Sequence, residues 1–315
     1  MKKRRLGNTG LQVSKLCFGS LTMGPLQANL TPDEGGKLLR HSFEKGINFI
    51  DTAELYETYP HILKALNGYK RDEIIIASKS YAYSKATAEA SLKKALKEMK
   101  IDYIDIFLLH EQENENTIRG HNEALEYFVK MKEKGYIRAF GISTHHIAAV
   151  KASGSINEIE VIHPIVNMSG LGIQDGNIED MLLAIDKAHK AGKGIYGMKP
   201  LGGGNLLRSF KECFDFVLNI SSLDSIAIGM QTIEEININI SIANDGTCSE
   251  ALKNVKLDNK KLSISEWCEK CGKCVHACSH NALKIKHDKL LIDHDKCVLC
   301  GYCSKYCPQF CIKVV

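Results

Sequence analysis

The chain has 315 residues, enough for one large domain of about 250 residues and a second, small one. Its charged fraction of 25% and apolar fraction of 44% are ordinary for a globular protein, and its net charge of +4 is too small to predict nucleic-acid binding. No apolar run reaches about 18 residues, and none follows the basic start at residues 1–5, so we expect neither a membrane span nor a signal peptide.

Short apolar runs alternate with longer amphipathic stretches from residue 14 to about residue 243, after a predicted hairpin at residues 1–13 that would close the bottom of the domain. The apolar runs predict strands at 15–19, 47–51, 74–79, 104–110, 137–143, 161–167, 194–199 and 225–229. Amphipathic patterns predict helices at 31–45, 85–100, 121–134, 178–190 and 232–243. This alternation predicts a (β/α)8 TIM barrel. The alternative is an open doubly wound sheet, but no glycine-rich dinucleotide fingerprint follows the first strand.

Polar residues stand at or just beyond the C-terminal ends of six consecutive predicted strands. The active sites of such barrels lie at that face, because the loops that follow all the strands meet there. A single polar residue after a strand is usually a helix cap or a solvated loop residue, whereas six in a row indicate a site. These residues are Asp51, Lys79, His110, Ser143, Asn167 and Lys199.

Residues 1–245 resemble the aldo-keto reductase family. The resemblance is carried by the segments RLGNTGLQVS (5–14), FIDTAELY (49–56), IASK (76–79), DIFLLH (105–110), GYIRAFGIS (135–143) and KPLGGG (199–204). It implies a catalytic tetrad of Asp51, Tyr56, Lys79 and His110. It also implies that Ser143 and Asn167 hold the nicotinamide ring, and that phosphate and adenosine contacts come from Lys199, Leu201, Gly202, Gly229, Gln231, Glu235 and Asn239.

The chemistry of carbonyl reduction suits these four residues. Hydride addition leaves an alkoxide-like oxygen that needs a proton and a polarising donor. A tyrosine with a pKa near 10 is a poor acid, so we expect Lys79 to lower the pKa of Tyr56. Asp51 would hold Lys79, and His110 would orient the carbonyl. Tyr59 is a nearby competitor, but the step of five residues from Asp51 to Tyr56 matches the family.

Two positions depart from the family at the expected grip on a 2′-phosphate. Where many relatives have basic residues, this chain has Met230 and Glu235. A carboxylate repels a phosphate and could instead accept hydrogen bonds from a ribose hydroxyl. The choice between NADH and NADPH therefore stays open.

The last 48 residues hold nine of the twelve cysteines, and eight of these nine form two copies of one spacing that are related by a shift of 29 residues. This spacing resembles bacterial two-cluster ferredoxins, which bind two [4Fe–4S] clusters, each with three thiolates from one run and the fourth from the other. It implies one cluster on Cys268, Cys271, Cys274 and Cys307 and a second on Cys278, Cys297, Cys300 and Cys303. The alternative is zinc, but tetrahedral zinc sites are usually built from two separated cysteine pairs. Cys17, Cys213, Cys248 and Cys311 are predicted packing residues.

The predicted organisation is thus a barrel at 1–245, a linker at 246–261 and a small ferredoxin-like α+β domain at 262–315. Nicotinamide carries two electrons and each cluster normally carries one, which gives three hypotheses. The first is a carbonyl reductase or alcohol dehydrogenase that uses NAD(P)H, with clusters that exchange electrons with the site or with a redox protein partner. The second is a barrel that binds FMN, and the third is an electron-carrier or docking module with a vestigial site. Clustered cysteines and no export signal predict a cytoplasmic location, and oxygen-sensitive clusters an anaerobic or microaerobic host.

Overall fold

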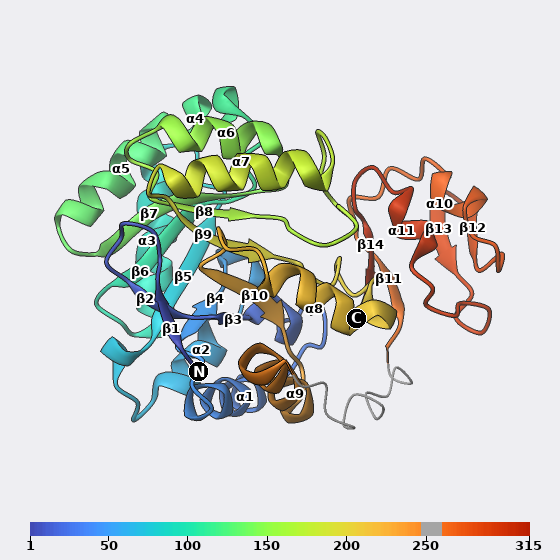
Figure 1. Ribbon diagram of the computed structural model, residues 1–315, viewed down its shortest axis with the longest axis horizontal. Helices are drawn as coiled ribbons and strands as arrows, with labels where there is room; N and C mark the ends of the chain where they lie inside the picture. Colours follow the sequence, from blue (N-terminus) through green and yellow to red (C-terminus); the bar gives the residue numbers. More distant parts are fainter. Residues whose placement is uncertain (247–259) are drawn as a thin grey trace.

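The computed structural model describes residues 1–246 and 260–315 (Figure 1). Eight parallel strands form a closed barrel, in which β10 returns to pair with β3 from Ile226 opposite Leu16 to Gly229 opposite Gly19. The predicted barrel is confirmed, and the open sheet is wrong. The strands are β3 (Leu16–Gly19), β4 (Phe49–Asp51), β5 (Ile75–Ser80), β6 (Ile104–Leu109), β7 (Ile137–Thr144), β8 (Val161–Pro164), β9 (Gly194–Met198) and β10 (Ser225–Gly229).

The helices surround the barrel and bury their apolar faces against it (Figure 1). The five predicted helices are present as α1 (Pro32–Glu44), α3 (Lys85–Met99), α5 (Asn122–Glu133), α7 (Ile178–Lys190) and α9 (Ile233–Asp245). Four more were not predicted: α2 (Tyr59–Leu66), α4 (Glu115–Gly120), α6 (Ile147–Ser155) and α8 (Phe210–Leu218). Short 3-10 turns are η1 (Ser20–Met23), η2 (Glu54–Tyr56), η3 (Arg71–Glu73) and η4 (Leu207–Ser209). No helix in the described ranges is long and apolar enough to cross a bilayer.

The N-terminal hairpin closes the bottom of the barrel, as predicted. Strands β1 (Lys3–Arg5) and β2 (Gln12–Ser14) pair antiparallel. Between and beside them, Leu6, Leu11 and Val13 are buried in the same apolar cluster as inward-facing strand residues such as Phe49. The bottom is therefore sealed by apolar side chains, and the opposite rim remains for a site.

One strand ends earlier than predicted. The apolar run at 161–167 suggested a strand to residue 167, but β8 ends at Pro164. Proline lacks a backbone N–H, so it cannot continue a regular ladder. Asn167 consequently lies in the loop that follows and not in the strand.

The C-terminal domain is a small α+β unit, as the ferredoxin resemblance predicts. It contains two antiparallel pairs, β11 (Leu262–Ile264) with β14 (Ile312–Val314) and β12 (Leu283–Lys286) with β13 (Lys289–Ile292). Each cysteine run carries a short helix, α10 (Lys273–His276) or α11 (Tyr302–Lys305). Both helices begin after a glycine at a φ of +78°, a conformation that favours glycine, so the 29-residue repeat in the sequence is also a structural repeat.

The predicted linker, and Cys248 with it, falls largely outside the described residues. At the end of that segment, Lys261 already belongs to the C-terminal domain, because its backbone exchanges two hydrogen bonds with Val315 at 2.8 and 2.9 Å.

The C-terminal domain packs against the loop that follows β9 (Figure 1). The Asn205 Nδ2 donates to the carbonyl of Ile312 at 2.9 Å, and the Val314 N–H donates to the carbonyl of Gly203 at 3.0 Å. Phe310 is only 2% exposed and belongs to the main apolar cluster of the barrel. The two domains thus share hydrogen bonds and a core residue at the barrel mouth.

We predict that Asn205→Ala lowers the free energy of unfolding by about 1–2 kcal/mol, because it leaves the buried Ile312 carbonyl without its donor. Urea unfolding followed by circular dichroism measures the change. Asn219→Ala is the matched control, since Asn219 is exposed just after α8. Equal stability of the two variants would show that this contact between the domains contributes nothing.

Candidate active site and cysteine-rich site

A buried ion pair lies at the centre of the barrel mouth. The Lys79 Nζ on β5 donates to both oxygens of Asp51 on β4, at 2.8 and 2.7 Å, and to the Thr52 carbonyl at 2.7 Å. The side chains of Lys79 and Asp51 are 1% and 6% exposed. Burial alone would raise the pKa of Asp51, but Lys79 and then His163 outweigh it and hold that pKa well below its usual range. The Asp51 carboxylate is therefore ionised at neutral pH.

Two residues that the sequence analysis did not predict, Tyr196 and His163, lie against the carboxylate of Asp51. The Tyr196 hydroxyl on β9 donates to Asp51 Oδ1 at 2.9 Å. The ring of His163 on β8 stacks on Tyr196 with 3.8 Å between ring centres, and its Nε2 lies 3.6 Å from the same carboxylate oxygen. The sequence contained one clue to them: His163 and Tyr196 are polar residues at inward-facing positions of otherwise apolar strands.

Three aromatic side chains, those of Tyr56, His110 and Tyr81, lie near the ion pair of Lys79 and Asp51. Lys79 Nζ lies 4.8 Å from the ring centre of Tyr56, at the end of η2. The His110 ring is 5.8 Å from the Tyr56 ring and stacks on Tyr81 at 4.5 Å. Burial, and next the Lys79 charge, lower the pKa of His110 well below its ordinary value, so its imidazole is neutral. The structure thus brings the four predicted tetrad residues together.

The expected effect of Lys79 on Tyr56 is wrong for this arrangement. Burial, followed by the Asp51 charge, raises the pKa of Tyr56 well above its ordinary value. The reason is that the charge of Lys79 is balanced by its two contacts with Asp51. Tyr56 is therefore a protonated donor at neutral pH. The competitor Tyr59 is 1% exposed, and its hydroxyl bonds Ser78 at 2.7 Å, away from the pocket lining.

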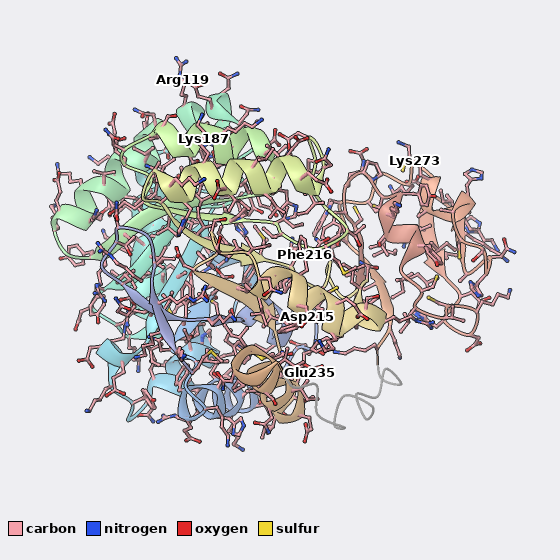
Figure 2. The ribbon with its side chains drawn as sticks, viewed as in Figure 1. Arg119, Lys187, Asp215, Phe216, Glu235 and Lys273 are labelled. Carbon is pink, nitrogen blue, oxygen red and sulfur yellow. The ribbon has the colours of Figure 1, made fainter. Side chains whose placement is uncertain are left out.

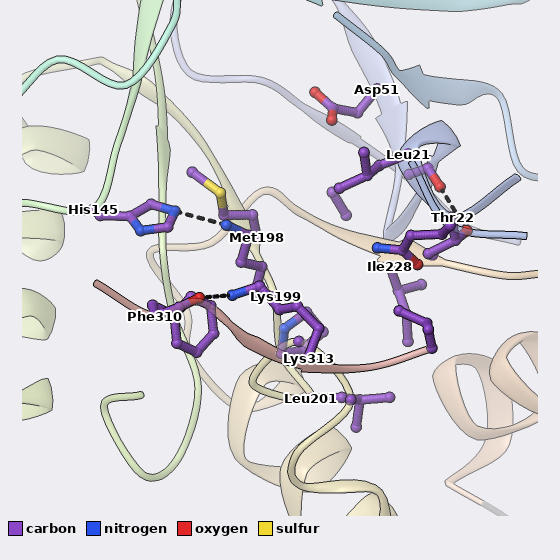
Figure 3. Close-up of a pocket in the computed structure, with 18 of the residues that line it drawn as sticks. Leu21, Thr22, Asp51, His145, Met198, Lys199, Leu201, Ile228, Phe310 and Lys313 are labelled. Atoms are coloured by element: carbon purple, nitrogen blue, oxygen red, sulfur yellow. Dashed lines mark hydrogen bonds between the residues drawn. The ribbon is translucent and has the colours of Figure 1, made fainter. Parts of the chain in front are cut away.

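A cavity of about 1260 Å³ opens in front of these groups (Figure 3). Most of the predicted site residues line it: Asp51, Tyr56, His110, Lys199, Leu201, Gly229, Gln231, Glu235 and Asn239. Four predicted residues lie behind the lining: Lys79, Ser143, Asn167 and Gly202.

Ser143 and Asn167 shape the loops beside the cavity. The Ser143 Oγ accepts a hydrogen bond from the Glu111 N–H at 2.9 Å. The Asn167 amide donates to and accepts from the backbone of Leu171, both at 2.9 Å. Their predicted contact with a nicotinamide ring stays a prediction.

The far end of the cavity contains a second ion pair, which joins α9 to the start of the C-terminal domain. Lys260 Nζ lies 3.1 Å from a Glu235 oxygen and donates to Gln231 Oε1 at 2.7 Å. Figure 2 labels Glu235 at α9, facing the C-terminal domain. Lys260 therefore balances the carboxylate that we expected to repel a 2′-phosphate, and no pattern in the sequence predicts this partner.

The assignment of the eight repeated cysteines to two crossed groups stays a prediction, and the pKa shifts of two buried thiols show which cysteines lie near them. Burial raises the pKa of Cys274 to about 11, and the next contributions come from Cys307, Cys268 and Cys271. Burial raises the pKa of Cys303 to about 12, with further contributions from Cys278, Cys300, Cys274 and Cys297.

Backbone N–H groups point at one sulfur of each group, from Ala282 to Cys278 at 3.3 Å and from Cys311 to Cys307 at 3.2 Å. No described cysteine forms a disulfide. Within the described ranges, no three Cys, His, Asp or Glu side chains converge closely enough to hold a single metal ion. Two sets of four thiols with N–H donors at the sulfurs form a donor set that fits iron–sulfur clusters. Of the other cysteines, Cys17, Cys213 and Cys311 are buried, as packing residues should be.

Comparisons with known proteins match both parts of the chain. A family model described as "Aldo/keto reductase family" matches residues 15–268, and one described as "4Fe-4S dicluster domain" matches residues 267–311. The uncharacterized oxidoreductase YqkF of Bacillus subtilis is 26% identical over 293 residues, which cover 78% of this chain and 92% of that protein. L-galactose dehydrogenase of Arabidopsis thaliana is 23% identical, with coverages of 84% and 92%.

Solved structures agree on the barrel. A putative aldo-keto reductase from Pseudomonas aeruginosa superposes with a TM-score of 0.66 at 25% identity, covering 76% of this chain and 94% of that one. The aldo-keto reductase AKR11C1 from Bacillus halodurans gives a TM-score of 0.65 at 24% identity, with coverages of 81% and 96%. The latter likeness supports the fold alone.

We predict that Lys79→Met destabilises the protein by about 3–5 kcal/mol, because it leaves the Asp51 carboxylate buried without its counter-charge. Asp51→Asn combined with Lys79→Met should cost clearly less than the sum of the two single changes, since the double variant has no unpaired charge. Urea unfolding at neutral pH gives all three values. Additive effects would show that the two groups do not depend on each other.

Proposed function

The chain belongs to the aldo/keto reductase family, and from this premise we propose that it reduces a small-molecule carbonyl compound, or oxidises the corresponding alcohol, with NAD(P)H. The observation that carries the proposal is the meeting of Asp51, Tyr56, Lys79 and His110 at the rim of one large cavity. The protein is an oxidoreductase; the direction of the reaction, its substrate and its cofactor are what we propose.

The residues of the chain supply the proton and the orientation. A bound nicotinamide would supply the hydride that adds to the carbonyl carbon. Tyr56 is protonated at neutral pH and lines the cavity, so its hydroxyl would give a proton to the carbonyl oxygen. Lys79, whose Nζ lies 4.8 Å from the centre of the Tyr56 ring, would hold that ring in place beside the carbonyl. The neutral His110 would hydrogen-bond the same oxygen and set its position.

The cavity has room and partners for a dinucleotide along one wall. Leu201 follows β9, Gly229 ends β10, and Gln231, Glu235 and Asn239 lie at or near α9. These residues would contact the phosphates and the adenosine. Because Lys260 neutralises Glu235, the far end need not exclude a 2′-phosphate, and both NADH and NADPH suit it.

The C-terminal domain would hold two [4Fe–4S] clusters on the two crossed groups of thiols. Such clusters supply one-electron transfer. We propose that they exchange electrons with the barrel site or with a redox protein partner, and that the protein works in a reducing compartment such as the cytoplasm, where its free thiols persist. An FMN in the barrel would reconcile one-electron with two-electron transfer, and the position of Glu235 at the expected 2′-phosphate grip keeps this second candidate open.

We predict that Tyr56→Phe lowers kcat for carbonyl reduction by about 10²- to 10⁴-fold, because it removes the proton donor, and leaves nicotinamide affinity unchanged. Steady-state rates and nucleotide fluorescence titration measure the two quantities. Tyr83→Phe is the control, since Tyr83 is 63% exposed and outside the cavity lining. Full activity of the Tyr56 variant would remove this residue from the mechanism.

We predict about eight iron and about eight sulfide ions per chain after anaerobic purification, because eight thiolates can ligate two cubes. Metal and acid-labile sulfide analysis gives the counts, and two zinc ions without sulfide would refute the assignment. In the same preparation, denaturation should release no flavin if the nicotinamide proposal holds, whereas a flavin spectrum would favour the FMN candidate.

A further inference from the structure

Two lysines from different domains meet in one wall of the cavity. Lys199 follows β9 of the barrel, and Lys313 lies on β14 of the C-terminal domain. The ring of Phe310 lies beside both amines, with the Lys313 Nζ 3.0 Å and the Lys199 Nζ 5.4 Å from its centre. Figure 3 shows both side chains beside Phe310 and His145, across the cavity from Leu21, Thr22 and Ile228.

Neither lysine has a carboxylate partner among the described residues. The Lys199 Nζ donates to His145 Nε2 at 2.8 Å, and the Lys313 Nζ donates to the Phe310 carbonyl. The other lysines differ: Lys260 and Lys211 in the lining contact Glu235 and Asp215, and Lys79 behind the lining contacts Asp51. Glu111, an acid within electrostatic reach of both lysines, accepts a hydrogen bond from the Tyr81 hydroxyl at 2.5 Å. The wall thus gathers two amines without a counter-ion of their own.

The pKa values of these two amines are lowered in a way that a bound anion would reverse. Burial lowers the pKa of Lys199 to about 8, and burial together with repulsion from Lys199 lowers the pKa of Lys313 to about 6. An anion bound between them would favour the charged form of both amines. His145 is neutral, because burial and then the Lys199 charge lower its pKa well below the ordinary value, so it accepts a hydrogen bond from Lys199 without opposing an anion.

Both amines are held in place before any ligand arrives. The backbone of Lys199 has a φ of +57°, which is uncommon outside glycine, and its side chain is fixed by His145. Lys313 is fixed by its contact with the Phe310 carbonyl, and Phe310 is itself buried in the barrel core. A rigid pair of donors loses little entropy on binding.

The pair lies at the catalytic end of the cavity. Lys199 is within electrostatic reach of Lys79, Asp51 and Glu111, and His145 is within reach of His110. The end that we assign to adenosine is elsewhere, where Lys260 contacts Glu235 and Gln231 on the other side of the mouth. An anionic group bound at the pair would therefore belong to the molecule that meets Tyr56 and His110.

We propose that Lys199 and Lys313 bind a carboxylate of the substrate, so that the protein acts on oxo acids in preference to neutral carbonyl compounds. This inference rests on the proposed carbonyl chemistry and adds the class of substrate. It also gives the C-terminal domain a direct part in the site, because Lys313 belongs to that domain.

The test measures equilibrium binding of oxamate, a 2-oxo acid analogue that is not reduced, by calorimetry on the holo protein. Lys313→Met and Lys199→Met keep the length of the side chain and remove the charge, while Lys313→Arg keeps the charge. Lys289→Gln is the control, since Lys289 is exposed on β13 and outside the cavity lining. Thermal unfolding and iron content verify that each variant is intact, and NADPH affinity is measured in parallel by fluorescence.

We expect both Met variants to weaken oxamate binding by about tenfold or more, the loss of one charge-assisted hydrogen bond, with NADPH affinity unchanged. Lys313→Arg should retain most of the affinity, and the control all of it. In turnover, the Met variants should lose kcat/KM for phenylglyoxylate and keep it for methyl phenylglyoxylate.

Three results would overturn the inference: no oxamate binding by the unmodified protein, unchanged binding in both Met variants, or a loss of NADPH affinity in place of oxamate affinity. Binding of oxamate that depends on Lys313 in a protein that reduces no carbonyl compound would refute the proposed reaction and retain the anion site. The two proposals can therefore fail separately.

Discussion

Closure of eight parallel strands is the constraint on which the rest of the structure depends. Because every strand runs in the same direction, the residues at the strand ends meet at one rim, which brings Asp51 of β4 within 2.7 Å of Lys79 of β5. Burial at that rim then decides the chemistry. It forces the two charges to pair, it leaves His110 neutral, and it keeps Tyr56 protonated.

The second domain is part of the site and not an attachment at a distance. Cys307, a ligand in the proposed cluster assignment, precedes Phe310 by three residues, and the ring of Phe310 packs into the barrel mouth. Lys260 and Lys313, from the first and last segments of the domain, both line the same cavity. Loss of the contact between the two domains would therefore alter the lining of the cavity as well as the position of the C-terminal domain. Any coupling between the two chemistries has this shared wall as its structural basis.

The sequence predicted what depends on local pattern and spacing. The eight strands and five of the helices follow from periodicity, and the structure has them. The features that the sequence could not predict depend on contacts between residues far apart in the chain. His163 and Tyr196 support Asp51 only because the barrel closes, and Lys260 meets Glu235 only because the domains pack together. Helix α8 was not predicted for another reason. It has only nine residues, so the spacing of its apolar residues Phe210, Phe214 and Val217 is too short a pattern to be distinguished from the loop before it.

Hydrogen–deuterium exchange with and without NADPH tests most directly the central claim that both domains enclose one pocket. The account predicts slower exchange on nucleotide binding in peptides of the barrel loop at 199–206 and also in the C-terminal segment at 310–315. The hairpin of β12 and β13 lies away from the cavity and should not change (Figure 1). Protection confined to the barrel, with the segment at 310–315 exchanging at the same rate in both states, would contradict it.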